Sequence, residues 1–217
     1  MSIDPETLRQ IEELSHDDRP LLVLDVDDVI LEFIRPFPRY LEKAGFRLQM
    51  GSFRLNGNIF HLDTGAAAET ERVRELLARF FDDQHAWQTV TDGAAEAIET
   101  IAKDAEVVLL TAMPHRHRDI RRRHLDELGL TYPLLTTEMA KGPAIRRLRG
   151  TVPRPVAFVD DMPHNLLSAQ KEVPDAHLFH LMAENALREF LPPTDDGITV
   201  VDDWRDAQPR IAAALGL

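Results

Sequence analysis

Three aspartates lie together in one of the most apolar stretches of the chain. The stretch LLVLDVDDVILEF, residues 21–33, contains Asp25, Asp27 and Asp28. Carboxylates are rarely buried unless a partner compensates for their lost hydration. In a strand that extends this far, Asp25 and Asp27 would share a face and Asp28 would point elsewhere. Two such neighbours need a cation or a large pKa shift in a dry site. The alternative is that they are solvated loop residues, or helix caps just beyond a strand end.

Further polar residues follow other apolar runs of the chain. The run VVLLTA contains Thr111, the run AFVDD ends in Asp160 and Asp161, and Lys141 precedes a Gly-Pro helix start. In open parallel sheets the ligand site lies at the carboxyl ends of the strands, near the point where the strand order reverses. We therefore expect these residues to meet the first acid pair at one edge of a sheet.

This set of side chains suits the transfer of a phosphoryl group. Asp25 could attack phosphorus and form an acyl phosphate, while Asp27 could protonate the leaving oxygen and then activate water. A Mg²⁺ ion would offset the charge of phosphate and aspartate, and the second acid pair would complete its oxygen ligands. The Thr111 hydroxyl and the Lys141 ammonium would hold the phosphate oxygens.

The elements that must position these residues can be predicted from the apolar pattern. Buried parallel strands are indicated by the runs at 21–26, 105–112, 155–161 and 176–181. Helical spacing separates these runs, a first helix begins after Asp4 and Pro5, and a last one begins after Asp203. The alternation predicts an α/β fold, with a Rossmann-like parallel sheet covered by helices on both faces.

Four pieces of the sequence resemble the haloacid dehalogenase superfamily of phosphatases and phosphotransferases. They are VLDVDDVI, VLLTA, the lysine of AKGPA, and FVDDMPHN, in the correct order after apolar runs. The resemblance implies that Asp25 is the nucleophile and a metal ligand. It also implies that Asp27 is the general acid and base, with its backbone carbonyl facing the metal. Thr111 and Lys141 match the phosphate-holding positions.

The resemblance assigns roles to the second acid pair less directly, and Asp28 departs from the family's pattern. Asp161 aligns best with the direct metal ligand, whereas Asp160 acts through water or through Lys141. Family members that cleave carbon–halogen bonds lack the second acid, so Asp27 favours phosphate chemistry. Many members have glycine at the position of Asp28, where a small residue eases a turn beside the site. An aspartate there would alter the metal environment or the entry to the cap.

The long segment between the first two motifs predicts a second unit. Residues 34–89 interrupt the strand–helix alternation with helical patterns at 38–46 and 69–81 and a hairpin signal, Asn56-Gly57, within 52–62. We expect a core of residues 1–33 and 90–217 and a small mixed α+β cap of residues 34–89. In the family such caps close over the site and select the substrate, in keeping with the general role of lids.

The composition indicates which classes of partner and which cellular compartment to expect. The net charge of −12 disfavours nucleic acid and anionic membranes, and the content of 44% hydrophobic and 29% charged residues is ordinary for a globular protein. The chain has no cysteine, and its first residues are unlike a secretory signal. No apolar stretch is long enough for a membrane span. We expect a cytoplasmic monomer or homodimer with a small phosphorylated substrate.

The basic run HRHRDIRRRH, residues 115–124, is interpreted as the solvated face of the helix after Thr111. Arg116 begins just past a strand end that should face the substrate, so it is a candidate substrate-binding residue. His115 and His117 form only a weak metal-ligand pattern. Asn165 is expected to order the loop after the second acid pair.

The predicted function is a Mg²⁺-dependent phosphohydrolase that works through an aspartyl-phosphate intermediate. A phosphotransferase or phosphomutase would use the same residues and differ in the acceptor. A phospho-switch similar to receiver domains also gathers acids, a hydroxyl and a lysine at strand ends, but its phosphorylated acid lies on a middle strand. A binding protein that has lost catalysis is a further alternative, which the complete set of acids disfavours.

Overall fold

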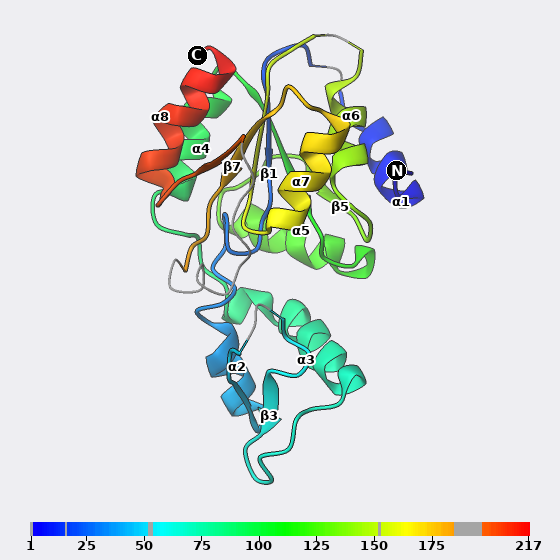
Figure 1. Ribbon diagram of the computed structural model, residues 1–217, viewed down its shortest axis with the longest axis vertical. Coiled ribbons are helices and arrows are strands. Elements are labelled where there is room, and N and C mark those ends of the chain that lie inside the picture. Colours follow the sequence, from blue (N-terminus) through cyan, green and yellow to red (C-terminus); the bar gives the residue numbers. More distant parts are fainter. Residues whose placement is uncertain (1, 16, 52–53, 152, 185–196) are drawn as a thin grey trace.

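The computed structural model describes residues 2–15, 17–51, 54–151, 153–184 and 197–217. Within these residues a parallel sheet of six strands has the order β5-β4-β1-β6-β7-β8 (Figure 1). The strands are β1 (Leu21–Leu24), β4 (Glu106–Thr111), β5 (Leu134–Thr136), β6 (Val156–Asp160), β7 (His177–His180) and β8 (Ile198–Val200). Strand β1 lies inside the sheet, paired with β4 on one side and with β6 on the other. The crevice of such a sheet lies at the carboxyl ends of these three strands.

Helices cover both faces of the sheet (Figure 1). The helices of this larger unit are α1 (Pro5–Glu12), α4 (Ala94–Ala102), α5 (Arg118–Glu127), α6 (Gly142–Arg149), α7 (Pro163–Glu172) and α8 (Trp204–Leu215). Asp4 accepts hydrogen bonds from the N–H groups of Glu6 and Thr7, and Asp203 caps α8 in the same way. Both caps were expected from the sequence, since aspartate before a helix start satisfies its free N–H groups.

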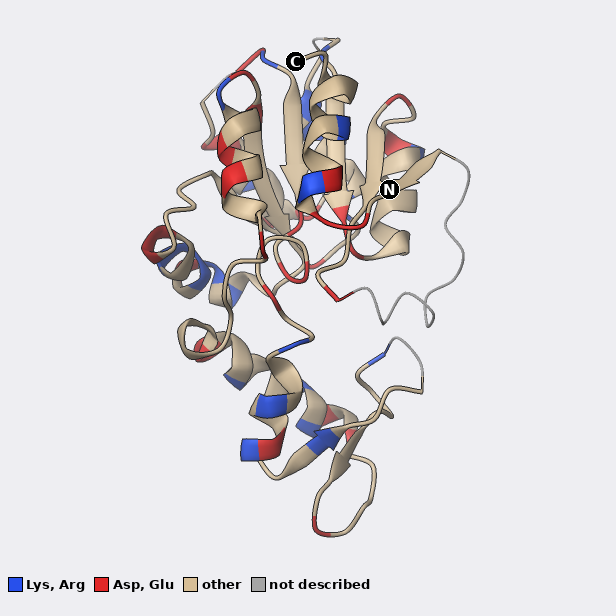
Figure 2. Cartoon of the chain, turned by 90° about the vertical axis from the view of Figure 1, so that its left-hand side faces the viewer, with Lys and Arg blue, Asp and Glu red and all other residues tan. Residues whose placement is uncertain are grey.

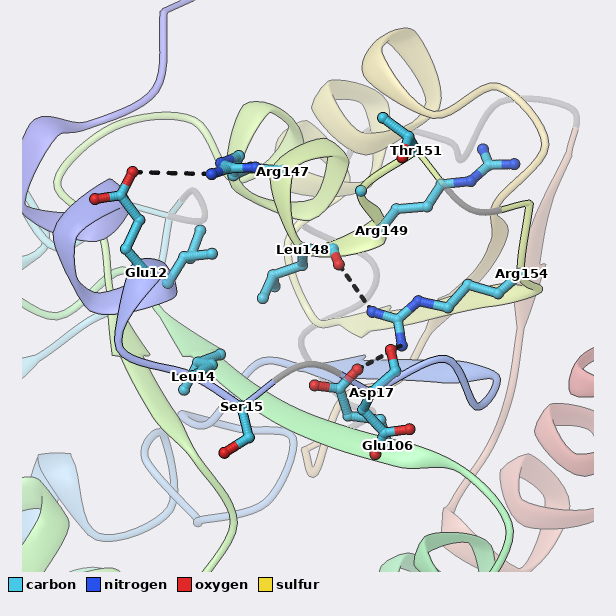
Figure 3. A pocket seen from close by; sticks show the side chains of 12 residues that line it. Glu12, Leu14, Ser15, Asp17, Glu106, Arg147, Leu148, Arg149, Thr151 and Arg154 are labelled. Atoms are coloured by element: carbon cyan, nitrogen blue, oxygen red, sulfur yellow. Dashed lines mark hydrogen bonds and ion pairs between the residues drawn. The ribbon is translucent and has the colours of Figure 1, made fainter.

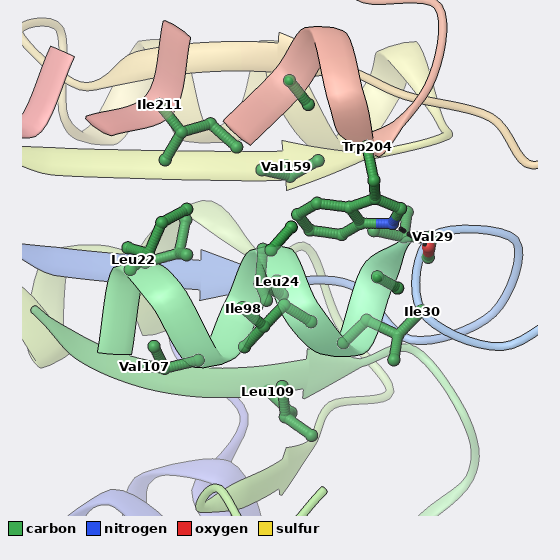
Figure 4. Packing of buried hydrophobic residues seen from close by; sticks show 14 of the residues in the cluster. Leu22, Leu24, Val29, Ile30, Ile98, Val107, Leu109, Val159, Trp204 and Ile211 are labelled. Atoms are coloured by element: carbon green, nitrogen blue, oxygen red, sulfur yellow. Dashed lines mark hydrogen bonds between the residues drawn. The ribbon is translucent and has the colours of Figure 1, made fainter. Parts of the chain in front are cut away.

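Alternate residues of the strands feed two separate hydrophobic clusters. Leu22 and Leu24 of β1 pack with α4 and α8, where the Trp204 Nε1 atom donates to the Val29 carbonyl oxygen at 2.9 Å (Figure 4). Leu21 and Val23 face the opposite cluster, to which α1, α6 and α7 contribute. Successive strand residues point to opposite faces, so a strand buried on both sides must be apolar throughout. This explains why LLVL shows no alternation.

A smaller lobe lies beyond the carboxyl ends of the strands, in the lower part of Figure 1. It contains α2 (Phe37–Lys43), β2 (Phe46–Leu48), β3 (Ile59–His61) and α3 (Thr70–Asp82), followed by the 3₁₀ turn η1 (Gln84–Ala86). Strands β2 and β3 are antiparallel. Phe37, Phe80 and Phe81 belong to an aromatic cluster that is separate from those of the sheet.

The predicted fold class is confirmed, with local differences. The expected strands are each present but shorter at their ends, and β5 and β8 were not among the predicted strands. In the smaller lobe the hairpin pairs 46–48 with 59–61, so the loop between its strands is longer than a tight Asn-Gly turn. Gly57 nevertheless has a positive φ of 84°, as its place in a turn requires. Among the described residues, no helix combines the length and the apolar character needed to cross a membrane.

Candidate active site

The loop after β1 is folded so that its apolar side chains enter the core while its acids face away. The Asp25 N–H continues the pairing with β6 by donating to the Val159 carbonyl oxygen at 2.9 Å. The chain then turns back, and the N–H groups of Ile30 and Leu31 both donate to the Val26 carbonyl oxygen at 2.9 Å. Val26, Ile30 and Leu31 are fully buried. Figure 2 shows acidic residues, in red, on the loops between the sheet and the smaller lobe.

Asp28 holds the turn that leads from the sheet to the smaller lobe. It is the one non-glycine residue with a positive φ, 57°, among the described residues. Its Oδ1 atom accepts hydrogen bonds from the N–H groups of Phe33 at 2.9 Å and Ile34 at 3.0 Å. Glycine adopts this backbone conformation freely, and aspartate and asparagine are the next best tolerated. Asp28 therefore adds two hydrogen bonds that a glycine could not make.

Lys141 joins the acids that follow β1 and β6. Its Nζ atom lies 2.6 Å from an oxygen of Asp25 and 2.6 Å from an oxygen of Asp160, and its side chain is completely buried. Asp160 also accepts from the Met162 N–H at 2.8 Å and from the Asn165 Nδ2 atom at 3.0 Å and 3.2 Å. Both oxygens of Asp160 are thus engaged by donors, and Asn165 orders this loop as expected.

A glycine next to Lys141 brings helices α6 and α7 together. A Cβ atom on Gly142 would lie 2.1 Å from the Ser168 carbonyl oxygen, which no side chain can tolerate. The Gly142 N–H instead donates to the Ser168 Oγ atom at 3.1 Å. Since Lys141 is the N-cap residue of α6, this close packing fixes the position from which its side chain reaches the two acids.

Asp25, Asp160 and Asp161 could hold a metal ion. Each offers a carboxylate oxygen, and these atoms all lie within 4.8 Å of one another. Asp161 lines a cavity, and its carboxylate accepts no hydrogen bond from the described part of the chain. One lysine faces three buried carboxylates here, so a further cation would compensate for charge that the protein leaves unpaired. The donor set, all hard oxygens, suits an ion such as Mg²⁺ or Ca²⁺.

Burial dominates the protonation of this cluster. It raises the pKa of Asp25 to about 7, even though the Lys141 ammonium opposes the shift. Burial and the charges of Asp25 and Asp160 hold the pKa of Asp161 well above its ordinary value. For Lys141, burial lowers the pKa, but the attraction of Asp160 and Asp25 outweighs it and the pKa is raised. Lys141 therefore stays charged, while burial disfavours the ionised forms of Asp25 and Asp161, which a bound cation would stabilise.

Asp27 is held from the side by two residues that the sequence did not indicate. Its Oδ1 atom accepts from the Gln88 Nε2 atom at 2.8 Å and from the Arg121 Nη2 atom at 2.9 Å. Arg121 is completely buried and also bonds to the side chains of Gln84 and Gln88. The Asp27 Oδ2 atom accepts no hydrogen bond from the described residues. One oxygen of Asp27 is thus anchored and the other is left available.

The interpretation of residues 115–124 as a solvated face is wrong for part of the run. His117 at the N-cap of α5 and Arg121 and His124 within the helix are buried, and each bonds to the last residue of α3 or to the segment that follows it. His117 lies 3.0 Å from Asp82, and the His124 Nε2 atom lies 3.1 Å from the Gln88 carbonyl oxygen. These three residues have the spacing of one face of a helix, but polar side chains at such positions do not indicate a buried face.

Arg116 lies outside this buried group. It is exposed, its Nε atom donates to the His117 Nε2 atom at 3.0 Å, and it does not line the cavity above the acids. The structure therefore does not bring Arg116 together with the other predicted site residues.

A cavity of about 460 Å³ opens above the acids, between the sheet and the smaller lobe. Asp25, Asp27, Thr111 and Asp161 line it, whereas the completely buried Lys141 lies behind Asp25. A second cavity, of about 430 Å³, lies at the amino ends of the strands (Figure 3). Its arginines face carboxylates, as in the pair of Arg154 and Glu106 at 2.6 Å, and none of the predicted site residues lies there.

Solved structures share this fold at low sequence identity. A hydrolase of the HAD family from Deinococcus radiodurans, with bound phosphate and sodium, is 14% identical, with a TM-score of 0.58 over 91% of this chain and 96% of its own. The Bacillus subtilis protein YfnB, named as a HAD hydrolase and bound to magnesium, is 13% identical, with a TM-score of 0.59 over 93% and 100%. A Thermotoga maritima protein named as a β-phosphoglucomutase is 17% identical, with a TM-score of 0.57 over 89% and 99%. No protein-family model and no curated protein sequence matches the chain.

Proposed function

We propose that this chain is a Mg²⁺-dependent phosphohydrolase that acts on a small phosphorylated metabolite through an aspartyl-phosphate intermediate. The observation that carries the proposal is the Lys141 ammonium, 2.6 Å from both Asp25 and Asp160, beside the free carboxylate of Asp161. These groups meet under a cavity at the carboxyl end of the sheet. The shared fold with proteins that hold phosphate or magnesium supports it.

Each residue has a defined role in this reaction. Asp25 attacks phosphorus, and the bond from phosphorus to the leaving oxygen breaks as the free oxygen of Asp27 supplies a proton to it. Asp27 then removes a proton from water, which attacks phosphorus and releases inorganic phosphate and the Asp25 carboxylate. Thr111 donates a hydrogen bond to a phosphate oxygen, and Lys141 offsets negative charge behind the nucleophile.

Asp25 and Asp161 would hold Mg²⁺ directly, and Asp160 would act mainly by fixing Lys141, since its oxygens are already occupied by donors. The ion would supply charge neutralisation for the phosphate oxygens. The backbone carbonyl of Asp27 is a further proposed ligand. Arg116 is not included in the proposed site.

The smaller lobe, residues 34–89, would act as a cap over a core of residues 1–33 and 90–217. Its α3 contributes Leu77 and Phe81 to the cavity. A cap of this kind would keep water from the aspartyl phosphate until the leaving group has departed.

A phosphotransferase or phosphomutase is the second candidate, and the shared fold with the protein named as a β-phosphoglucomutase favours keeping it. It would use the same residues, with a substrate hydroxyl in place of water as the acceptor.

The test is a phosphate-release assay with and without Mg²⁺ over a panel of phosphate monoesters. Asp25→Asn should abolish release, whereas Asp175→Asn, which changes an exposed acid paired with Arg149, should leave it unchanged. Release that persists in the Asp25 variant would contradict the mechanism. A second candidate function would be favoured if added sugar or alcohol acceptors took the phosphoryl group faster than water did.

A further inference from the structure

The cavity above the acids has a floor and walls of different chemistry. The floor is made of the carboxylates and Thr111 described above. The walls are mostly apolar and include Phe33, Leu55, Leu77, Phe81, Met113 and Met162, which come from the smaller lobe and from the loops after β4 and β6. Apart from the floor, the side chains with charge or hydrogen-bonding groups in the lining are Asp28, Arg54, His164 and Asn165. Asp28 already accepts from the N–H groups of Phe33 and Ile34, and Asn165 is bound to Asp160.

Such walls discriminate between kinds of leaving group. A sugar or polyol would bring several hydroxyls against side chains that cannot replace their hydrogen bonds to water, and each unsatisfied group weakens binding. A hydrocarbon or aromatic body would instead gain about fourfold in affinity for each methylene-sized group removed from water. A cavity of about 460 Å³ holds a phosphate together with one ring-sized body.

Arg54 is a cation of the lobe whose side chain has no partner among the described residues. It lies on the loop between β2 and β3, is exposed, lines the cavity, and makes no side-chain hydrogen bond or ion pair with the described residues. Of the other arginines of the lobe, Arg72 pairs with Glu75 at 2.8 Å and Arg74 pairs with Glu71, whereas Arg39 and Arg79 do not line the cavity. The guanidinium therefore remains available for an anionic group of the substrate.

We propose that the substrate is a phosphate monoester whose leaving group has an apolar, ring-sized body and carries a carboxylate at the end remote from the phosphate, where it pairs with Arg54. This inference rests on the proposed phosphohydrolase function. The phosphate occupies the floor beside Asp25 and Thr111, the body contacts Leu77 and Phe81, and the carboxylate meets the arginine. Guanidinium and carboxylate pair through charge-assisted hydrogen bonds.

The experiment compares benzyl phosphate, 4-carboxybenzyl phosphate and glucose 6-phosphate, all esters of primary alcohols, so that their intrinsic reactivity is similar. With Mg²⁺ present, kcat/KM for benzyl phosphate should exceed that for glucose 6-phosphate at least tenfold. The carboxylate should add a further threefold to tenfold, mainly through KM. Arg54→Gln should remove this second gain, measured as the ratio of kcat/KM for 4-carboxybenzyl phosphate to kcat/KM for benzyl phosphate in the same variant. The matched control Arg74→Gln, on the exposed side of α3, should preserve both gains.

The outcomes separate this inference from the function on which it rests. Preference for glucose 6-phosphate, with turnover that requires Asp25, would overturn the inference and leave the phosphohydrolase intact. An Arg54→Gln variant that slows both benzyl esters equally would overturn the carboxylate contact. If no ester of the three, nor any other monoester, releases phosphate in an Asp25-dependent way, both proposals fail. Direct binding of 4-carboxybenzyl phosphate to the Asp25→Asn variant, lost on adding Arg54→Gln, would support the inference independently of turnover.

Discussion

Asp28 gives a sharp test of how burial controls this site, because one atom can be changed while its backbone role is kept. In Asp28→Asn the amide oxygen can still accept the N–H groups of Phe33 and Ile34, which lie 2.9 Å and 3.0 Å from Oδ1. Asparagine also tolerates the positive φ of 57°. The substitution therefore removes the ionisation of Asp28 and little else.

The magnitude follows from the pKa of the buried group. Burial raises the pKa of Asp28 from 3.8 to about 7, although the two N–H donors oppose the shift. A folded-state pKa above the unfolded one means that the folded protein holds the proton more tightly. The stability from this group is then complete below about pH 4 and is lost as the pH rises through 7. The full loss is about 4 kcal/mol, of which about 3 kcal/mol falls between pH 5 and pH 8.

The assay is urea unfolding at pH 5 and pH 8 in the presence of a chelator, so that no divalent ion competes with the proton. The free energy of unfolding of Asp28→Asn, relative to the unmodified protein, should increase by about 3 kcal/mol between the two pH values. Asp63→Asn, which changes an exposed loop acid, should show no such trend. Parallel pH dependence of Asp28→Asn and the unmodified protein would refute the reasoning, as would a relative loss of stability in the variant at pH 8.

Three further predictions concern metal binding and the buried residues Gly142 and Arg121. Binding of Mg²⁺ should weaken as the pH falls below about 7, because burial raises the pKa of Asp25 to about 7 and that of Asp161 above its ordinary value, so protons compete with the metal. Calorimetry in two buffers of different protonation enthalpy should show proton release, and equal affinity at pH 5.5 and pH 8 would contradict this. Gly142→Ala should lower the free energy of unfolding by about 3 kcal/mol, since its Cβ would lie 2.1 Å from the Ser168 carbonyl oxygen. Gly51→Ala, whose nearest contact is an ordinary 3.6 Å, is the control for denaturant unfolding. Arg121→Met should cost about 2 to 3 kcal/mol in the same measurement, near the low end for a broken buried pair because Asp27 stays partly exposed. Arg123→Met, at an exposed position of the same helix, should cost clearly less, and equal losses would contradict a stabilising role for the buried contacts of Arg121.

The fold was predictable because its strands are buried on both faces. A strand such as Leu21–Leu24 must be apolar throughout because both of its faces are buried. Helical spacing between such runs leaves few alternatives to a parallel sheet. Strands β5 and β8 were not predicted because each has only three residues and lies at an edge of the sheet. An edge strand carries too few apolar residues to stand out from a loop.

The grouping of the site residues was predictable for a related reason. Parallel strands end at the same edge, so the residues after β1, β4 and β6 must meet whatever their separation in the sequence. The contact of Lys141 with both Asp25 and Asp160 is one of the expected alternatives for the second acid pair. Which acid remained free was not decided by the sequence, because it depends on where the Asn165 amide and the Met162 N–H point.

The residues that the sequence missed share one physical property, which is that a polar side chain is buried against another polar side chain. Arg121 looks like a surface residue in a basic run until Asp27, Gln84 and Gln88 are seen around it. Pairings between segments this distant leave no periodic trace, since each partner is polar and neither marks a hydrophobic face. Asp28 differs in its partners, because its carboxylate is buried against the backbone N–H groups of Phe33 and Ile34. Its positive φ of 57° is a conformation that favours glycine, and only the fold reveals that its carboxylate anchors the entry to the smaller lobe. At positions such as Arg121 and Asp28, therefore, a charged residue in the sequence does not indicate an exposed side chain in the fold.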